Sequence, residues 1–286
     1  MLGSAEQSAE HRQSKGVALR IARFSRDGEV AFGVVEGGHG NGVIDLAQDE
    51  LVVAEISGHP FGAGVVRFTG NRYRLADVRL LAPVLPSKVI AVEGTYGGDG
   101  EEAGGGRRGP VLFFKPSTAV AGPDDPISYP VKLTSRVDYE GELAVVIGRL
   151  CREVPPERAS DVIFGYACAN DVTARDLQES DGQWDRAKAF DSFCPLGPWI
   201  ETDADPADLA ITTSVNGAVR QLARTSQLRH DVPALIAFIS EVMTLVPGDV
   251  LLTGTPPGSG PLEVGDEVAV TIENIGTLTS KVVSRD

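Results

Sequence analysis

Residues 137–148 read Val-Asp-Tyr-Glu-Gly-Glu-Leu-Ala-Val-Val-Ile-Gly, and this stretch carries the fold prediction. Its apolar half is typical of a buried β-strand, which Gly148 closes. Two acidic residues, Glu140 and Glu142, stand where the apolar run begins. Because side chains at positions i and i+2 of a strand point to the same face, we expect both carboxylates to converge on one point.

A third acidic residue, Asp171, follows a second apolar segment that ends in Ala-Asn-Asp at 169–171. Buried like charges repel one another, and a divalent cation would offset that repulsion. Carboxylates with no His or Cys beside them favour Mg²⁺ or Mn²⁺ over zinc. The spacing alone also fits a second interpretation, in which Glu140 and Glu142 lie on a solvated strand edge and Asp171 caps a helix.

Composition narrows the class of protein. The chain has 286 residues, 42% of them hydrophobic, with 33 Gly and 18 Pro, which is typical of a globular protein rich in turns and strands. A net charge of -14 argues against nucleic acid or an anionic membrane as a partner. The three cysteines (Cys151, Cys168 and Cys194) form no CxxC pair, so we expect a reduced, cytoplasmic protein. No apolar run is long enough to span a bilayer.

We expect three regions along the chain: a disordered tail at 1–15, a small N-terminal subdomain at 16–85 and a main domain at 86–286. Alternating apolar residues on both sides of Asp27-Gly28 predict a hairpin in the subdomain.

Three helices are predicted among many strands. A short one is expected at 49–56, and a second at 174–187 is weakened by Gly182. The strongest helical pattern covers 231–245, with Asp231 as its N-cap. Because strands dominate elsewhere, the predicted fold class is mainly β with a few helices (α+β).

The main domain resembles one known family, the fumarylacetoacetate hydrolase superfamily, in its branch of 2-hydroxyhepta-2,4-diene-1,7-dioate isomerases and acylpyruvases. That resemblance implies a mixed β-sandwich roll that forms a homodimer and holds Mg²⁺ or Mn²⁺. It also places Glu140, Glu142 and Asp171 on the family's metal-ligand positions. The matching segments, in the family's order, are 114–117, 137–148, 165–166, 169–178, 183–184 with Lys188, 190–199, 215–217, 243–249 and 252–256.

Members of this family act on small 2-oxo or 2,4-dioxo acids. The resemblance therefore implies a metal-dependent hydrolase or lyase that cleaves a C–C bond through a metal-stabilised enolate, as in acylpyruvate hydrolysis or oxaloacetate decarboxylation. Lys188 falls on the active-site lysine of the family and would hold the substrate or its enolate. The other substrate-binding residues that the resemblance implies are Arg175, Gln178, Tyr96, Lys115 and Thr255. Three of these positions have a structural alternative: Arg175 in a salt bridge to Asp176 or Asp171, Lys188 on a solvated helix, and Thr255 in a turn.

One segment departs from the family pattern. Hydrolytic members carry a lid motif with a Tyr, two residues, a His and then a Glu three residues later, and the His-Glu pair activates water. Here Tyr96 and Glu102 match, but Asp99 stands where the His belongs. Two alternatives follow. In the first, Asp99 and Glu102 share a proton and act as the base. In the second, the chain is a non-hydrolytic isomerase, tautomerase or dehydratase. A third hypothesis is a catalytically silent protein that binds a metal or an oxo acid.

Overall fold

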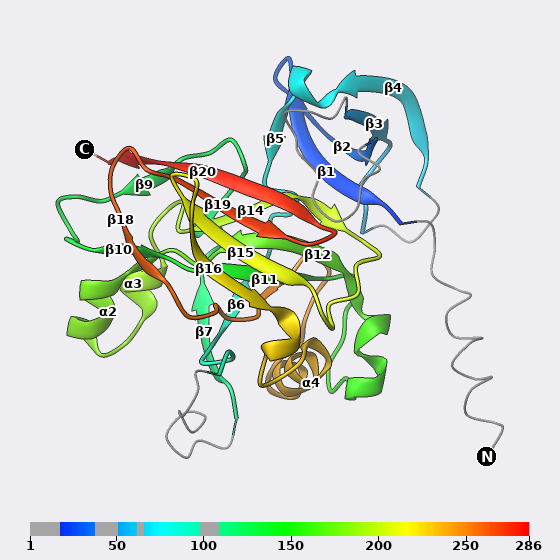
Figure 1. The fold of residues 1–286 in the computed structure, drawn as a ribbon. Helices are drawn as coiled ribbons and strands as arrows, with labels where there is room; N and C mark the ends of the chain where they lie inside the picture. The colour runs from blue at the N-terminus through cyan, green and yellow to red at the C-terminus, as the bar shows by residue number, and fades with distance from the viewer. Residues whose placement is uncertain (1–17, 38–50, 62–65, 98–108, 286) are drawn as a thin grey trace.

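The computed structural model describes residues 18–37, 51–61, 66–97 and 109–285, and strands dominate it (Figure 1). The mainly β, α+β fold class is therefore confirmed. The expected tail at 1–15 lies outside the described residues.

A large sheet forms the centre of the molecule, and in the described residues it has 12 strands. Its main path runs β4-β3-β2-β1-β14-β12-β11-β17-β6-β7, with β5 paired to β1 and β8 to β14. The strands are β1 (Arg20–Arg26), β2 (Glu29–Glu36), β3 (Val52–Ile56), β4 (Phe68–Arg74), β5 (Arg79–Leu81), β6 (Val89–Glu93), β7 (Val111–Lys115), β8 (Val120–Ala121), β11 (Gly141–Ile147), β12 (Ile163–Asn170), β14 (Cys194–Glu201) and β17 (Val250–Leu252).

A second sheet of 5 described strands packs on one face of the central sheet, in the order β16-β15-β19-β20-β9. The core between them joins Val145 of β11 and Cys168 of β12 to Ile211 of β15 and Ile272 of β19. Helix α4 (Val232–Val242) closes this core with Leu235 and other apolar residues. The strands of the second sheet are β9 (Ile127–Tyr129), β15 (Ala210–Val215), β16 (Ala218–Arg224), β19 (Glu267–Ile272) and β20 (Gly276–Ser284).

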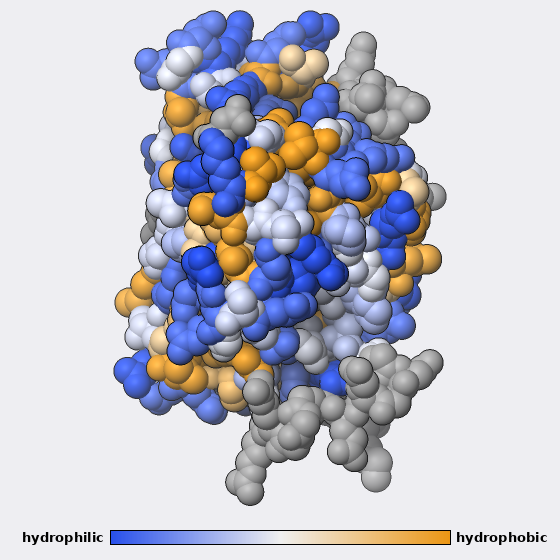
Figure 2. Space-filling view, turned by 90° about the vertical axis from the view of Figure 1, so that its left-hand side faces the viewer, coloured by the Kyte–Doolittle hydropathy of each residue, from blue (hydrophilic) through white to orange (hydrophobic). Residues whose placement is uncertain are grey.

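A small sheet with the order β13-β10-β18 lies beside two short helices, α2 and α3, on the left of Figure 1. Figure 2 views the molecule from that side and shows hydrophobic residues in separate groups among hydrophilic ones. Within the described residues, no helix combines the length and the apolar character needed to cross a membrane. The remaining elements are β10 (Val137–Tyr139), β13 (Thr173–Ala174), β18 (Gly260–Leu262), α2 (Arg175–Asp181), α3 (Asp185–Lys188) and the 3₁₀ turns η2 (Leu75–Asp77), η4 (Ser117–Ala119), η5 (Pro156–Asp161) and η6 (Thr225–Gln227).

Local sequence signals were accurate where turn or cap chemistry is strong. Asp27 and Gly28 have φ values of 52° and 87°, as a type I′ turn between β1 and β2 requires. The Asp231 side chain accepts a hydrogen bond of 2.8 Å from Ala234 N, so the predicted N-cap of α4 is confirmed. The helix expected at 174–187 is divided into α2 and α3 at Gly182, whose φ is 69°.

The helix predicted at 49–56 is wrong in its described part. Residues 52–56 form β3, which pairs with β2 on one side and β4 on the other. The β-branched residues Val52, Val53 and Ile56 favour a strand. Pairing on both edges also satisfies the backbone N–H and C=O groups, which a helix would have satisfied by internal hydrogen bonds. Strand β1 in turn pairs with β14, so the N-terminal strands extend the central sheet. The division near residue 86 stays a prediction.

The 137–148 stretch is two strands rather than one. β10 belongs to the small sheet and β11 to the central sheet, and Glu140 lies at the junction. Gly141 begins β11, and a Cβ at this position would overlap the Thr213 side chain, so the close approach of Thr213 requires glycine here. The junction places Glu140 where both sheets meet.

Candidate metal centre

Three acidic side chains from two segments meet at one end of the central sheet. β11 and β12 run antiparallel with Gly141 opposite Asn170, so the start of β11 lies beside the end of β12. Asp171 N donates a hydrogen bond of 2.8 Å to Glu140 O and fixes the two segments together. One carboxylate oxygen each from Glu140, Glu142 and Asp171 lies within 4.8 Å of the others, and all three residues are buried. The interpretation of Glu140 and Glu142 as a solvated edge is therefore wrong.

Basic side chains surround two of these carboxylates. Lys188 Nζ, at the end of α3, lies 2.8 Å from Glu140 Oε2 and 2.7 Å from Asp171 Oδ2. Lys115 Nζ, at the end of β7, lies 2.5 Å from Asp171 Oδ1 and also donates to the Val172 carbonyl. Both lysines are buried, so the alternative of a solvated Lys188 is wrong.

Arg175 adds a third positive charge. Its Nη2 hydrogen-bonds to Glu140 Oε1, and its Nε lies 3.0 Å from Asp138 Oδ2. Its Nη1 donates to Gln178 Oε1 at 2.6 Å. The expected alternative partners Asp176 and Asp171 are not the ones it contacts among the described residues. Arg175 thus joins the metal-ligand candidate Glu140 to Gln178.

Glu142 differs from the other two carboxylates. Its Oε2 accepts a hydrogen bond of 2.7 Å from Gly254 N, but within the described part of the chain no basic side chain forms an ion pair with it. Burial raises the pKa of Glu142 well above its usual value, and the charges of Asp171 and Glu140 raise it further. This buried carboxylate lacks a counter-charge of its own.

For Asp171 and Lys188, in contrast, neighbouring charges outweigh the effect of burial on the pKa. Burial alone would raise the pKa of Asp171, but the ammonium groups of Lys115 and Lys188 outweigh it and lower that pKa. Burial would likewise lower the pKa of Lys188, and the charges of Asp171 and Glu140 raise it instead. Asp171 is thus held as a carboxylate and Lys188 as an ammonium.

Two backbone features hold the carboxylates in place. Gly254 has a φ of 94°, and a Cβ there would overlap Thr95 Oγ1, so only glycine lets its N–H reach Glu142. Thr95 Oγ1 donates to Thr253 O at 2.6 Å and braces the same turn. Asn170 Oδ1 accepts from Glu140 N at 2.9 Å. Neither Gly254 nor Asn170 was predicted from the sequence as a site residue, although both lie in segments that carried the resemblance.

A cavity of about 100 Å³ opens over the three carboxylates. Lys188 reaches its wall and lies 4.7 Å from the ring centroid of Phe113, which in turn packs edge-on against Trp184 at 5.2 Å. Phe113 was not foreseen from the sequence. The other predicted residues that line the cavity are Arg175, Gln178 and Thr255.

Two other predicted substrate-binding residues, Lys115 and Tyr96, do not line the cavity. Lys115 does not line the cavity and contacts Asp171 from behind, so its substrate-binding role stays a prediction. The Tyr96 hydroxyl is buried, with no hydrogen-bond partner among the described residues, and it also lies outside the cavity lining. Thr255, which lines the cavity, donates from Oγ1 to Gly141 O at 2.9 Å and accepts from Gln221, and its substrate-binding role stays a prediction. The lid residues Asp99 and Glu102 lie outside the described residues.

The donor set fits a hard divalent cation. It consists of carboxylate oxygens only, which Mg²⁺ and Mn²⁺ prefer. Among the described residues, Lys115, Lys188 and Arg175 form ion pairs with Glu140 or Asp171, and Asp138 is paired with Arg175 and Arg136. Glu142 has no such partner there, so a cation bound here would supply its counter-charge.

Comparison with known proteins agrees with this geometry. A family model described as the C-terminal domain of fumarylacetoacetate (FAA) hydrolase matches residues 90–283, and a second, Rv2993c-like N-terminal, matches residues 19–83. The chain belongs to the fumarylacetoacetate hydrolase superfamily. Among its relatives in that superfamily is Protein Rv2993c from Mycobacterium tuberculosis, with 52% identity over 271 residues that cover 93% of this chain and 99% of the relative.

Relatives that are named for an activity include more than one reaction type. The structure of 2-hydroxyhepta-2,4-diene-1,7-dioate isomerase from Mycobacterium marinum is 51% identical, covers 93% of this chain and 99% of that one, and has a TM-score of 0.83. Oxaloacetate tautomerase Fahd2a from Rattus norvegicus is 38% identical over 87% of this chain and 86% of its own. Maleylpyruvate hydrolase from Sphingobium sp. SYK-6, in complex with Mn(II) and pyruvate, is 33% identical over 93% of this chain and all of that one (100%), with a TM-score of 0.73.

Proposed function

We propose that this chain is a Mg²⁺- or Mn²⁺-dependent enzyme that isomerises or tautomerises a small 2-oxo or 2,4-dioxo acid through its enolate. The observation that carries the proposal is the buried cluster of Glu140, Glu142 and Asp171 with Lys188 beside it. Similarity to a protein named an isomerase and to one named a tautomerase supports this reaction type.

The three carboxylates would hold the cation. When bound, the cation supplies Lewis-acid stabilisation of the negative charge on the oxygen of an enolate. Lys188 Nζ already lies between Glu140 and Asp171 and donates hydrogen bonds to both. Because its pKa is raised, Lys188 stays protonated, so its role is to attract an anionic substrate rather than to accept a proton.

The cavity wall offers contacts for the rest of the substrate. Arg175 and Gln178 are hydrogen-bonded to each other on α2 and both line the cavity, an arrangement suited to the carboxylate of an oxo acid. Phe113 and Trp184 form an apolar wall near Lys188. We propose that these groups orient the substrate over the three carboxylates.

C–C bond cleavage, by hydrolysis or decarboxylation, is the second candidate function. It is favoured by the similarity to maleylpyruvate hydrolase. The sequence gives it less support than isomerisation, because Asp99 stands at the position of the lid His that activates water in hydrolytic members. Isomerisation and tautomerisation need no attacking water. A homodimer, a cytoplasmic location and an oxo-acid substrate stay predictions.

The test uses the enol form of oxaloacetate in the presence of Mn²⁺. Loss of the enol absorbance and formation of pyruvate are recorded in the same reaction. We expect the protein to speed the loss of the enol relative to Mn²⁺ alone, without forming additional pyruvate. We expect Glu142→Gln to abolish this acceleration. The exposed Glu179→Gln on α2 is the matched control and should retain full activity. Pyruvate formation would favour the second candidate. Tight Mn²⁺ binding without turnover of this or any other oxo acid would leave a catalytically silent binding protein.

A further inference from the structure

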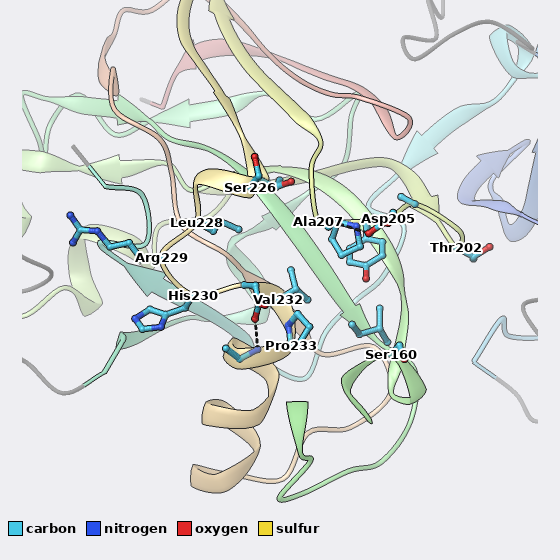
Figure 3. Close-up of a pocket in the computed structure, with 17 residues that line it drawn as sticks. Ser160, Thr202, Asp205, Ala207, Ser226, Leu228, Arg229, His230, Val232 and Pro233 are labelled. Carbon is cyan, nitrogen blue, oxygen red and sulfur yellow. Dashed lines mark hydrogen bonds between the residues drawn. The ribbon is translucent and has the colours of Figure 1, made fainter. Parts of the chain in front are cut away.

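A second cavity, larger than the one over the carboxylates, lies on another part of the molecule. Its volume is about 780 Å³, and Figure 3 shows its walls around the start of α4. The segment 202–207, the η6 turn with the residues that follow it, and the end of η5 contribute the other walls. It shares no described lining residue with the cavity over Glu140, Glu142 and Asp171.

Strand β12 passes both cavities, but the two cavities lie at different points along its length. Tyr166 lines the second cavity from β12, and Asp171 follows the end of the same strand. Five residues of extended chain span about 16 Å. A small 2-oxo acid held by the carboxylates therefore does not reach the second cavity.

Tyr166 is the polar side chain in this cavity that points to a ligand. The residue is 7% exposed, its hydroxyl makes no hydrogen bond within the described residues, and that hydroxyl is open to the cavity rather than sealed in the core. Burial raises the pKa of Tyr166, and the charge of Asp205 raises it further. The hydroxyl is thus held protonated, and a ligand in the cavity could accept a hydrogen bond from it.

Most other polar groups in the walls already have partners. Asp231 accepts from Ala234 N and Asp205 from Ala207 N. Thr202 Oγ1 accepts from Leu19 N, and Ser226 Oγ donates to Asp208. Among the described lining residues, Tyr166 is therefore a largely buried side chain whose hydroxyl remains available to a ligand.

Charge and apolar surface define what the cavity accepts. Figure 3 shows Asp205 and Thr202 on one side and Arg229 and His230 on the other. Arg229 is already engaged, and its guanidinium lies close to Gly97. Asp205 disfavours an anion beside Tyr166. The rest of the lining is largely apolar and includes Ile163, Ala204, Pro206, Leu228, Val232 and Pro233.

We propose that this cavity is a second ligand site, which takes a small, uncharged, mainly apolar ring compound with one carbonyl or ether oxygen that accepts a hydrogen bond from Tyr166. A mainly apolar cavity with a small number of fixed polar groups is the usual form of a small-molecule site. Nothing in the proposed enolate chemistry uses it.

The experiment measures the binding of three matched probes to the full chain by saturation-transfer NMR. Acetophenone carries the acceptor, α-methylstyrene has the same shape without it, and benzoate is the charged analogue. We expect acetophenone to bind to the wild type with a Kd of about 1 mM and α-methylstyrene to bind about fivefold more weakly, as one hydrogen bond predicts. Benzoate should not bind in competition with acetophenone.

Two variants locate the binding. Tyr166→Phe keeps the ring and removes the hydroxyl, so it should weaken acetophenone about fivefold and leave α-methylstyrene unchanged. Ala207→Trp places a large side chain in the cavity wall from an exposed position and should abolish binding of both. Acetophenone binding that is unchanged in either variant would overturn the proposal. So would equal binding of all three probes, or no binding of acetophenone up to its solubility.

Discussion

The backbone N–H of Gly254 lies 2.7 Å from Glu142 Oε2, and this hydrogen bond joins residues that are 112 positions apart in the chain. It aims the one carboxylate of the cluster that has no basic partner among the described residues. The turn after β17 therefore helps to set the geometry of the candidate metal centre.

Replacement of Gly254 by Ala should damage both stability and metal binding. The φ of 94° is unfavourable for alanine, and its Cβ would overlap Thr95 Oγ1 and lie 3.0 Å from Val92 O. We expect the free energy of unfolding to fall by about 3 kcal/mol and the affinity for Mn²⁺ to fall with it. Urea denaturation and calorimetric titration measure the two effects.

Gly217→Ala is the matched control for that variant. Gly217 has a φ of 76°, but a Cβ there meets no atom within 4 Å. It should lose about 1 kcal/mol and keep its affinity for Mn²⁺. Equal losses of Mn²⁺ affinity in Gly254→Ala and Gly217→Ala would show that the hydrogen bond from Gly254 to Glu142 is unimportant for metal binding.

Glu142→Gln and Glu140→Gln should change the stability of the metal-free protein in opposite directions. In EDTA at pH 7, Glu142→Gln removes a group that can fold only by burying its charge or by taking up a proton, so we expect its Tm to rise by a few degrees. Glu140→Gln leaves Lys188 and Arg175 short of a counter-charge, so its Tm should fall. Both should lose the rise in Tm that Mn²⁺ gives the wild type. Shifts of the same sign in EDTA would contradict the charge assignment.

The affinity for Mn²⁺ should increase with pH. A raised pKa means that folded Glu142 keeps its proton above the usual range of a carboxyl group. The metal-free fold therefore loses stability as pH rises through that pKa, whereas a bound cation requires the deprotonated form. We expect the rise in Tm on adding Mn²⁺ to be small at pH 5 and to grow towards pH 8. A rise that is independent of pH, in a protein with Glu142 intact, would argue against Glu142 as a ligand.

Lys115→Met should be far more destabilising than loss of an exposed ion pair. Removal of this buried ammonium leaves Asp171 with one partner fewer, and we expect a loss of about 3 kcal/mol at pH 7. Because the pKa of Asp171 is lowered in the folded state, its stabilising effect is present above the usual carboxyl pKa and is lost as pH falls. The difference between the variant and the wild type should thus shrink in acid.

Arg158→Met supplies the comparison for Lys115→Met. Arg158 pairs with Asp161 at 2.9 Å, and its side chain is 70% exposed. Solvent screens such a pair, so the expected loss is below about 1 kcal/mol. Urea denaturation of both variants between pH 4 and pH 7 tests the contrast, and similar losses would mean that Asp171 does not depend on Lys115.

Some elements were predictable because their cause is local. The hairpin at Asp27-Gly28 and the N-cap Asp231 follow from backbone preferences within four residues. The helix predicted at 49–56 failed because pairing with β2 and β4, which lies beyond a local window, decided the conformation of residues 52–56. In the same way, the need for glycine at position 141 comes from the approach of Thr213, which lies far away in the chain.

The sequence by itself determined which residue types the site contains: three acidic residues at strand ends, and a lysine in a matching segment. Only the tertiary structure decided how their charges are distributed. It placed Lys115 behind Asp171, left Glu142 with Gly254 N alone, and opened a separate cavity at Tyr166. The physical reason is range: periodicity and capping act between neighbours in the chain, whereas burial and ion pairing depend on which distant segments the packed sheets bring into contact.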